Sequence, residues 1–277
     1  MTPLKNVSAS VLQRLKNQAQ AEGRVVLDVQ LMYAIERFLY RLSASDYCER
    51  FVLKGGIALL SLDPHFPRTT RDIDLLGATS NSVEHIVAVV QAICQTPVED
   101  DGIRFDPASV RGEAIREMDV YPGVRVQFVG VLGAARLPMQ LDVGFNDRLV
   151  VEPPVVALDT RLPDFPAPQV KVYPLEAIIA EKVEAFVQLG LLTGRVKDFY
   201  DIWFISETQP VDGSTLCAAL RQTFTQRGTT LPASLEDVLD GFPTDMDASG
   251  TDLVFQCADR AARQSVPGRR VHHGPVE

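Results

Sequence analysis

Two glycines followed by two aspartates constrain the fold of this chain more than any other feature. Gly55 and Gly56 come directly after a short apolar run at residues 51–53, and Asp72 and Asp74 open the next apolar segment. This order predicts a strand, a helix that begins at the glycines, and a second strand. Side chains two positions apart in a strand point to the same face, so we expect both carboxylates on one face of the second strand.

The chemistry of this pattern is that of a divalent cation and phosphate. Two adjacent carboxylates repel each other unless a cation or a proton neutralises them. Mg²⁺ typically takes one or two carboxylates together with substrate phosphates, and glycines let backbone N–H groups come close to phosphate oxygens. We therefore interpret Asp72 and Asp74 as metal ligands. The alternative is an edge strand with two solvated carboxylates, because an isolated Asp-x-Asp tripeptide is common.

A third carboxylate, Asp142, lies in a strand-like segment further along the chain. Apolar residues alternate with polar ones over residues 139–145, and Asp142 falls on the polar face. On a strand beside the one that carries Asp72 and Asp74, Asp142 would bring a third carboxylate to the same site. The alternative is an aspartate that faces solvent.

Lys182 lies on the apolar side of a predicted helix. Leu175, Ile179 and Phe186 form an apolar stripe at helical spacing, and Lys182 falls on that stripe. Burying an ammonium is costly unless it is paired or meets a ligand, which favours a phosphate or carboxylate partner. The alternative is a lysine that extends along the helix edge. Asp198 begins the next predicted helix. It is an acid that the helix dipole favours at this position, a partner of Lys182, or a base near the acceptor, and the sequence leaves these alternatives open.

Composition and charge describe an ordinary globular chain and argue against several classes of protein. The 277 residues carry a net charge of −9, so an RNA or DNA partner would need a local basic patch. The four cysteines form no Cys-x-x-Cys pair, which argues against a zinc site or a disulfide scaffold and favours a reducing cytoplasm. No apolar run approaches the ~18 residues of a membrane helix. Neither a Walker A motif nor a Gly-x-Ser-x-Gly elbow is present.

The order of the patterns predicts an α+β fold in two parts. Strand and helix patterns mix in the first half, a proline-rich connection covers residues 153–168, and helical patterns dominate afterwards. We expect a core with N-terminal helices at residues 1–168, a helical domain at 169–266 and a flexible tail at 267–277. Weaker helical patterns within the second part cover residues 215–225, 235–239 and 253–262.

Two groups of motifs resemble those of the AbiEii/AbiGii-type nucleotidyltransferases, which belong to the DNA polymerase β-like superfamily. The first runs from Lys54-Gly55-Gly56 to Arg68-x-Thr70-x-Asp72-Ile73-Asp74. The second comprises the segment from Tyr173 to Lys182 and the run Lys197-Asp198-Phe199-Tyr200-Asp201. The Gly-Gly pair is common in this branch, where the superfamily more usually has Gly-Ser. Together the motifs span residues 51–203.

The resemblance implies a polymerase β-like nucleotidyltransferase core with a mixed sheet, followed by a C-terminal helical bundle. It implies Mg²⁺ or Mn²⁺ as cofactor, an NTP as donor and the 3′ end of tRNA as acceptor. It also implies a cytoplasmic toxin of a bacterial toxin–antitoxin or phage-defence module, among which is the MenT type, with a cognate antitoxin as partner and no membrane partner.

The resemblance also assigns roles to individual positions. Asp72 and Asp74 would bind the metal, with Asp142 as a third carboxylate by its strand context. The catalytic residues would be Asp72, Asp74, Lys182 and Asp198. The residues assigned to nucleotide binding are Lys54, Gly55, Gly56, Arg68 and Thr70.

Two other functions remain open from the sequence. The first is a nucleotide-binding regulator without transferase activity. The second is a transferase of the same superfamily that modifies a protein or a small molecule, which the acidic net charge favours because tRNA binding usually needs a basic face. Transfer of the γ-phosphate instead of the nucleotide is a further alternative.

Overall fold

A computed structural model of the chain describes residues 6–61, 70–117, 121–189 and 196–232. The chain divides into two compact units, each with its own packing. The first unit comprises residues 1–147 and 153–173, and the second comprises residues 148–152 and 174–277.

The first unit contains most of the regular structure. Its elements in chain order are α1 (Val7–Glu22), α2 (Val26–Ser43), the short 3₁₀ helix η1 (Cys48–Arg50), β1 (Phe51–Lys54), α3 (Gly55–Leu60), β2 (Asp72–Gly77), α4 (Val83–Cys94), β3 (Ile103–Glu117), β4 (Tyr121–Leu132), β5 (Ala135–Phe145), β6 (Val155–Ala157) and β7 (Gln169–Val172). The described elements of the second unit are α5 (Leu175–Leu189), α6 (Val196–Thr208) and α7 (Gly213–Arg227).

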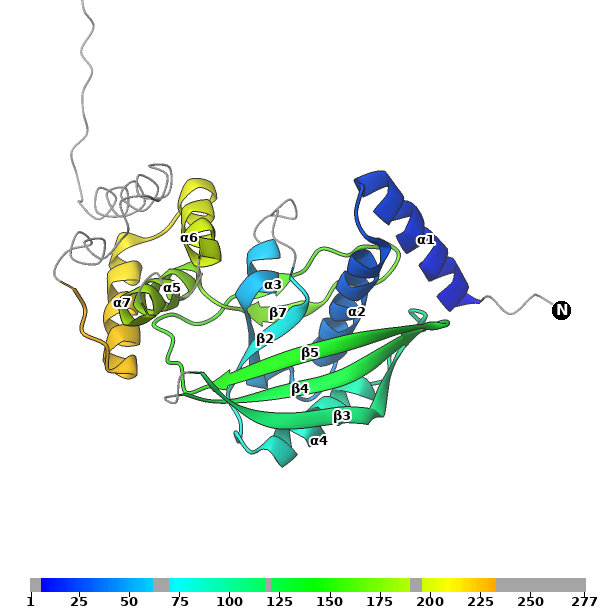
Figure 1. The fold of residues 1–277 in the computed structure, drawn as a ribbon, viewed down its shortest axis with the longest axis horizontal. Helices are drawn as coiled ribbons and strands as arrows, with labels where there is room; N and C mark the ends of the chain where they lie inside the picture. The colour runs from blue at the N-terminus through cyan, green and yellow to red at the C-terminus, as the bar shows by residue number, and fades with distance from the viewer. Residues whose placement is uncertain (1–5, 62–69, 118–120, 190–195, 233–277) are drawn as a thin grey trace, which may run out of the picture. The chain divides into compact units, whose positions relative to one another are not determined.

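A seven-stranded mixed sheet forms the centre of the first unit (Figure 1). Its strand order is β3-β4-β5-β2-β1-β7-β6. The pairs β2–β5 and β1–β7 are parallel, and the other neighbouring strands are antiparallel. The predicted α+β class and mixed sheet are therefore confirmed.

Two short strands differ from the sequence prediction. β6 lies inside the proline-rich segment that we interpreted as an extended connection, and β7 lies just after it. Because β7 pairs with β1 in the sheet, the first compact unit continues to Tyr173. Proline is tolerated at a sheet edge, and β6 is the last strand of the order.

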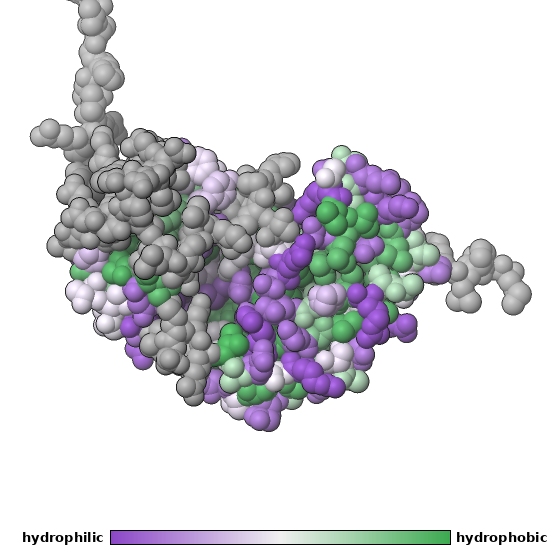
Figure 2. All heavy atoms as spheres, viewed as in Figure 1, coloured by the Kyte–Doolittle hydropathy of each residue, from purple (hydrophilic) through white to green (hydrophobic). Residues whose placement is uncertain are grey.

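One face of the sheet is covered by helices. α4 packs on β3 and β4, and α2 packs on β5 and on α4 (Figure 1). Toward them point the apolar residues of β5, of which Leu137, Met139 and Leu141 are buried. The residues between them point to the opposite face, as the alternation in the sequence predicts. In Figure 2, hydrophilic residues gather in a band across the middle of the first unit.

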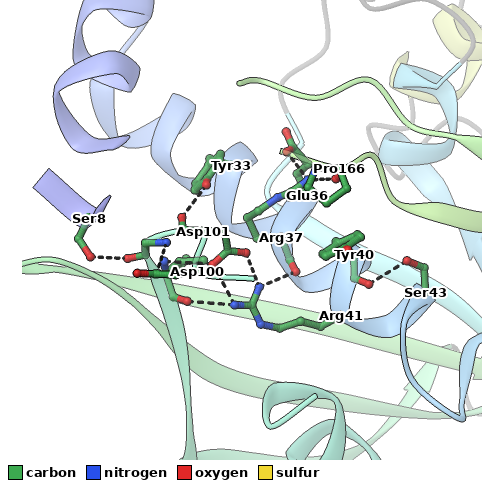
Figure 3. A network of polar contacts seen from close by, with 12 residues as sticks. Ser8, Tyr33, Glu36, Arg37, Tyr40, Arg41, Ser43, Asp100, Asp101 and Pro166 are labelled. Carbon is green, nitrogen blue, oxygen red and sulfur yellow. Dashed lines mark hydrogen bonds and ion pairs between the residues drawn. The ribbon is translucent and has the colours of Figure 1, made fainter. Parts of the chain in front are cut away.

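A buried polar network ties α2 to the surrounding chain (Figure 3). Arg41 donates two hydrogen bonds to the carboxylate of Asp101, at 2.7 and 2.9 Å, and Tyr33 donates to the carbonyl of Asp101. Arg37 is fully buried, pairs with Glu36 at 2.7 Å and donates to the carbonyl of Pro166. Burial raises the pKa of Glu36 above its usual range. These charges are buried in pairs, as their desolvation requires.

The second unit packs α5 against α6 and α7. The rings of Phe186 in α5 and Phe199 in α6 stack with centroids 3.8 Å apart. Glu184 is fully buried and accepts hydrogen bonds from Arg227 and from the Thr229 hydroxyl. The three described helices confirm the predicted helix that carries Lys182, the predicted helix near Asp198 and the helical pattern over residues 215–225. The weaker helical patterns after residue 232 and the predicted tail lie outside the described residues.

Candidate active site

Asp72 and Asp74 occupy one face of β2, as the strand alternation predicts. Asp72 is exposed and Asp74 is half-buried, whereas Ile73 and Leu75 on the other face are 0% and 2% exposed. β2 lies between β1 and β5 in the sheet, so its residues have neighbours on both sides. The two carboxylates are therefore held on a central strand instead of on a free edge.

Asp142 lies directly opposite Asp74. β5 runs parallel to β2, and the register pairs Asp74 with Asp142 and Asp72 with Gln140. Paired residues of neighbouring strands point to the same face, so Asp142 joins the face of the two β2 carboxylates. The strand neighbourhood that we expected from the sequence is thus present, while the role of Asp142 as a metal ligand stays a prediction.

Arg125 extends this row of charges by one strand. The register pairs Arg125 of β4 with Asp142, and its Nε and Nη2 donate to the two carboxylate oxygens at 2.9 and 2.8 Å. The hydrogen bonds to Asp142, with the nearby charge of Asp72, raise the pKa of Arg125 above its ordinary value. The guanidinium is therefore a permanent positive charge at the edge of the carboxylate group.

Lys54 of β1 lies on the other side of the carboxylates from Arg125. It lies opposite Asp74 in the antiparallel pair of β1 and β2. Its Nζ lies 2.8 Å from Asp147 Oδ2 and 4.6 Å from the centroid of the Tyr173 ring. Across four strands, the same face thus carries Arg125, Asp142, Asp74 and Lys54 in order. We call these four residues the charged row.

Gly55 provides the space that Asp74 occupies. A Cβ at Gly55 would lie 1.9 Å from Asp74 Oδ2, and the backbone φ of Gly55 is +64°. Gly56 also lacks room for a side chain, because a Cβ added there would lie 2.9 Å from the Cβ of Thr70. The glycines therefore bring the start of α3 close to the β2 carboxylate and to Thr70. Arg68, the remaining residue assigned to nucleotide binding, lies outside the described residues.

Lys182 and Asp198 come together in the second unit. Lys182 Nζ lies 2.6 Å from Asp198 Oδ1 and 2.7 Å from Asp201 Oδ2, and 15% of its side chain is exposed. Asp201 is fully buried. Of the alternatives that the sequence left open, the structure thus shows Lys182 paired with carboxylates. We call these three residues the lysine cluster.

Two residues of these groups were missed by sequence reasoning. Asp201 had a local signal, because residues three apart on a helix share a face and Asp198 was already a candidate. Arg125 had only an alternating strand pattern around it, and its partner is 17 residues away along the chain. Its pairing depends on strand register, which the local sequence does not show.

Asp72 and Asp74 fit a divalent cation, and Asp142 as a third ligand stays a prediction. Mg²⁺ usually takes one or two carboxylates and completes its shell with phosphate and water. Both oxygens of Asp142 already accept hydrogen bonds from Arg125. Within the described part of the chain, no group of three or more His, Cys, Asp or Glu residues is arranged to hold a metal ion. Asp72 and Asp74 on β2 would hold such an ion.

A central Asp-x-Asp strand beside a Gly-Gly helix start, with a third carboxylate on the neighbouring strand, is the arrangement that the motifs led us to expect of a nucleotidyltransferase. The chain belongs to the family described as nucleotidyl transferase AbiEii toxin of type IV toxin–antitoxin systems, whose model matches residues 37–261. This match confirms the resemblance that the motifs indicate. A search of curated protein sequences gives no match.

Two solved structures are similar to the chain. One is a candidate nucleotidyltransferase from H. pylori, with 16% identity, a TM-score of 0.45, and coverage of 86% of this chain and 93% of that one. The other is the JHP933 protein from Helicobacter pylori, with 14% identity, a TM-score of 0.43, and coverage of 85% and 89%. Separately, none of the described helices is both long and apolar enough to span a membrane.

Proposed function

We propose that the protein transfers a nucleotide from an NTP to the 3′ end of a tRNA, as the toxin of a toxin–antitoxin module with a cognate antitoxin. The observation that supports this most is the register that places Asp142 opposite Asp74, two residues from Asp72, in a chain of this family.

The chain's own residues take distinct parts in this reaction. Asp72 and Asp74 would hold a divalent cation, and Gly55 leaves the space beside the start of α3 that Asp74 occupies. When bound, the cation neutralises triphosphate charge and polarises the phosphoryl oxygens. In the role that the resemblance to the family implies, Lys182 would offset the negative charge that develops on the triphosphate, and Asp198 would position its ammonium. The acceptor hydroxyl loses its proton to solvent as its oxygen forms a bond to the α-phosphorus, the α–β phosphoanhydride bond breaks and pyrophosphate leaves.

The test is a transfer assay with labelled nucleotides and separated acceptors. The protein is incubated with Mg²⁺, total tRNA and each of the four NTPs, labelled with ³²P at either the α- or the γ-position. We expect label in RNA from the α-position only. Oxidation of the tRNA 3′ end with periodate removes the acceptor hydroxyls and abolishes the label.

Each alternative gives a different result in the same assay. Label in protein or in a small molecule identifies another acceptor, and label from the γ-position identifies phosphoryl transfer. Nucleotide binding without any labelled product identifies a regulator. Any of these three results contradicts the proposed transfer to tRNA.

A further inference from the structure

Arg111 lies in the same row as Asp72, on the face of the sheet that carries the carboxylates. α2 and α4 pack on the other face of β3, β4 and β5 (Figure 1), and Gly112, next to Arg111, faces α4. The register sets Asp72 beside Gln140 of β5, Gln140 beside Gln127 of β4, and Gln127 beside Arg111 of β3. Uncharged amides therefore join the carboxylate to the arginine.

Two further arginines lie on the same face, farther along the strands. Arg104 of β3 and Arg136 of β5 are the register neighbours of Val131 of β4, one on each side. Arg104 and Arg111 are seven residues apart, while their partners Val131 and Gln127 are four apart, because the β3–β4 register shifts between them. The shift brings both arginines to one face, since paired residues point the same way. We call Arg104, Arg111 and Arg136 the arginine group.

The three members of the arginine group are exposed and have no ion pair with any described carboxylate. Arg111 donates to two backbone carbonyls at 2.8 Å, which fixes its position and leaves its charge unbalanced. Two acids, Asp106 and Glu113, share this face, and the Asp106 carboxylate accepts a backbone hydrogen bond. Cations thus outnumber acids in this part of a chain whose net charge is −9.

An exposed guanidinium without an ion pair is suited to phosphate. It binds a phosphate through two parallel hydrogen bonds, and the glutamine amides of this face offer donors and acceptors to sugars and base edges. Arg136 lies about 13 Å along β5 from the row of Asp72, and Arg111 lies about 14 Å away across the strands. Cations spread over that span fit a chain of several phosphates whose end reaches Asp72 better than they fit one small anion.

We propose that the arginine group binds the phosphates of the acceptor RNA upstream of its 3′ end, which makes the Asp72 face of β3, β4 and β5 an RNA-binding surface. This inference rests on the proposed function, because the bound 3′ end would lie at Asp72 on the same face. A chain with a net charge of −9 can hold a polyanion in this way, since binding needs only a local set of cations. An acidic segment of a protein partner is the alternative occupant, and the test separates the two.

The test measures the affinity of the full chain for fluorescein-labelled total tRNA by anisotropy, at several KCl concentrations and without NTP. The variants are Arg104→Gln, Arg111→Gln, Arg136→Gln and the triple variant. Glu113→Gln makes the opposite charge change on the same face. Arg50→Gln on η1 is the control, because Arg50 is also exposed and has no ion pair with a described carboxylate.

Two additions complete the design. A fluorescein-labelled polyglutamate peptide is the probe for an acidic protein segment. Circular dichroism verifies that each variant is folded, and the single variants carry the test if the triple variant does not fold.

The arginine group predicts a distinct order among the variants. Each single arginine variant should weaken tRNA binding about three- to tenfold, and the triple variant at least about thirtyfold. The slope of log Kd against log salt should fall by about 1 for each arginine removed. Glu113→Gln should tighten tRNA binding about twofold, and Arg50→Gln should leave it unchanged.

Failure of the inference and failure of the proposed function are distinguishable. If the folded arginine variants bind tRNA with wild-type affinity and salt slope, the inference is wrong, while transfer to tRNA by the wild type upholds the proposed function. If they lose affinity for polyglutamate and keep it for tRNA, the face docks a protein and the inference is also wrong. If they lose tRNA binding but the wild type transfers no nucleotide to tRNA, the RNA surface stands and the proposed function is wrong.

Discussion

The carboxylate of Asp74 occupies the space that any side chain at Gly55 would need. A Cβ at Gly55 would lie 1.9 Å from Asp74 Oδ2, and the φ of +64° also favours glycine. The sequence pattern suggested that this glycine serves the approach of phosphate. In the structure its neighbour is the protein's own carboxylate, so the glycine first of all sets where Asp74 lies.

Replacing Gly55 therefore tests both the backbone strain at this position and the placement of Asp74. Gly23, at the end of α1, has the same φ of +64° with nothing near its Cβ, and it provides a matched control. We expect Gly23→Ala to lower the free energy of unfolding by about 1–2 kcal/mol. Gly55→Ala should cost more and displace Asp74, so that nucleotide transfer falls at least tenfold. Equal stability of the two variants in urea, with full transfer by Gly55→Ala, would contradict this relationship.

The buried pair of Arg41 and Asp101 should dominate the stability of the first unit's polar network. Their side chains are 7% and 3% exposed, so Arg41→Met leaves an aspartate buried without its cation. We expect a loss of about 3–5 kcal/mol in the free energy of unfolding. The surface pair of Arg14 and Asp164, with side chains 37% and 54% exposed, provides the comparison. Arg14→Met should cost less than about 1 kcal/mol, and similar losses in both variants would refute the argument.

Removing Lys182 should affect stability and activity together. Lys182→Met removes the cation that Asp198 and the fully buried Asp201 share, so we expect a loss of about 1.5–3 kcal/mol in the free energy of unfolding, as for hydrogen bonds to a charged group. Lys171→Met is the control, because Lys171 pairs with Glu49, whose side chain is 70% exposed.

A charge-preserving change separates the two effects of Lys182. Lys182→Arg keeps a cation beside both carboxylates but alters its position, so stability should largely survive while nucleotide transfer falls at least about tenfold. Urea unfolding and initial transfer rates measure the two quantities. A Lys182→Arg variant with wild-type transfer would show that the lysine cluster is only structural.

The described cysteines should differ strongly in reactivity. Burial raises the pKa of the Cys94 thiol to about 12, so almost no thiolate forms at pH 8. Cys217 is exposed and Cys48 is half-buried. With iodoacetamide at pH 8 and peptide mass spectrometry, Cys217 should be alkylated first, and Cys94 only after unfolding in guanidinium. Early modification of Cys94 in the folded protein would contradict its burial.

Much of the fold could be predicted because its signals are local. The alternation around Asp72 and Asp74 predicts their shared face, and the stripe around Lys182 predicts an inward lysine. β6 and β7 were missed because β6 lies in a proline-rich segment and each strand is only three or four residues long. Such short strands are recognised by their partners in the sheet rather than by their own pattern.

The candidate site also depends on contacts between strands that the local sequence does not show. The sequence placed Asp142 on a polar strand face, but only the register of β5 against β2 sets it opposite Asp74. Arg125 depends on a second register, that of β4 against β5. Registers are fixed by the packing of whole strands, so contacts such as the pair of Arg125 and Asp142 require the folded structure.

The most direct test of the account is nucleotide transfer by Asp74→Asn, measured with α-³²P-labelled NTP and tRNA. The substitution keeps the size of the side chain and removes its charge, and Asp159→Asn at an exposed position is the matched control. We predict that Asp74→Asn lowers the transfer rate at least about 100-fold, while Asp159→Asn retains the wild-type rate. Wild-type transfer by a folded Asp74→Asn variant would contradict the central claim.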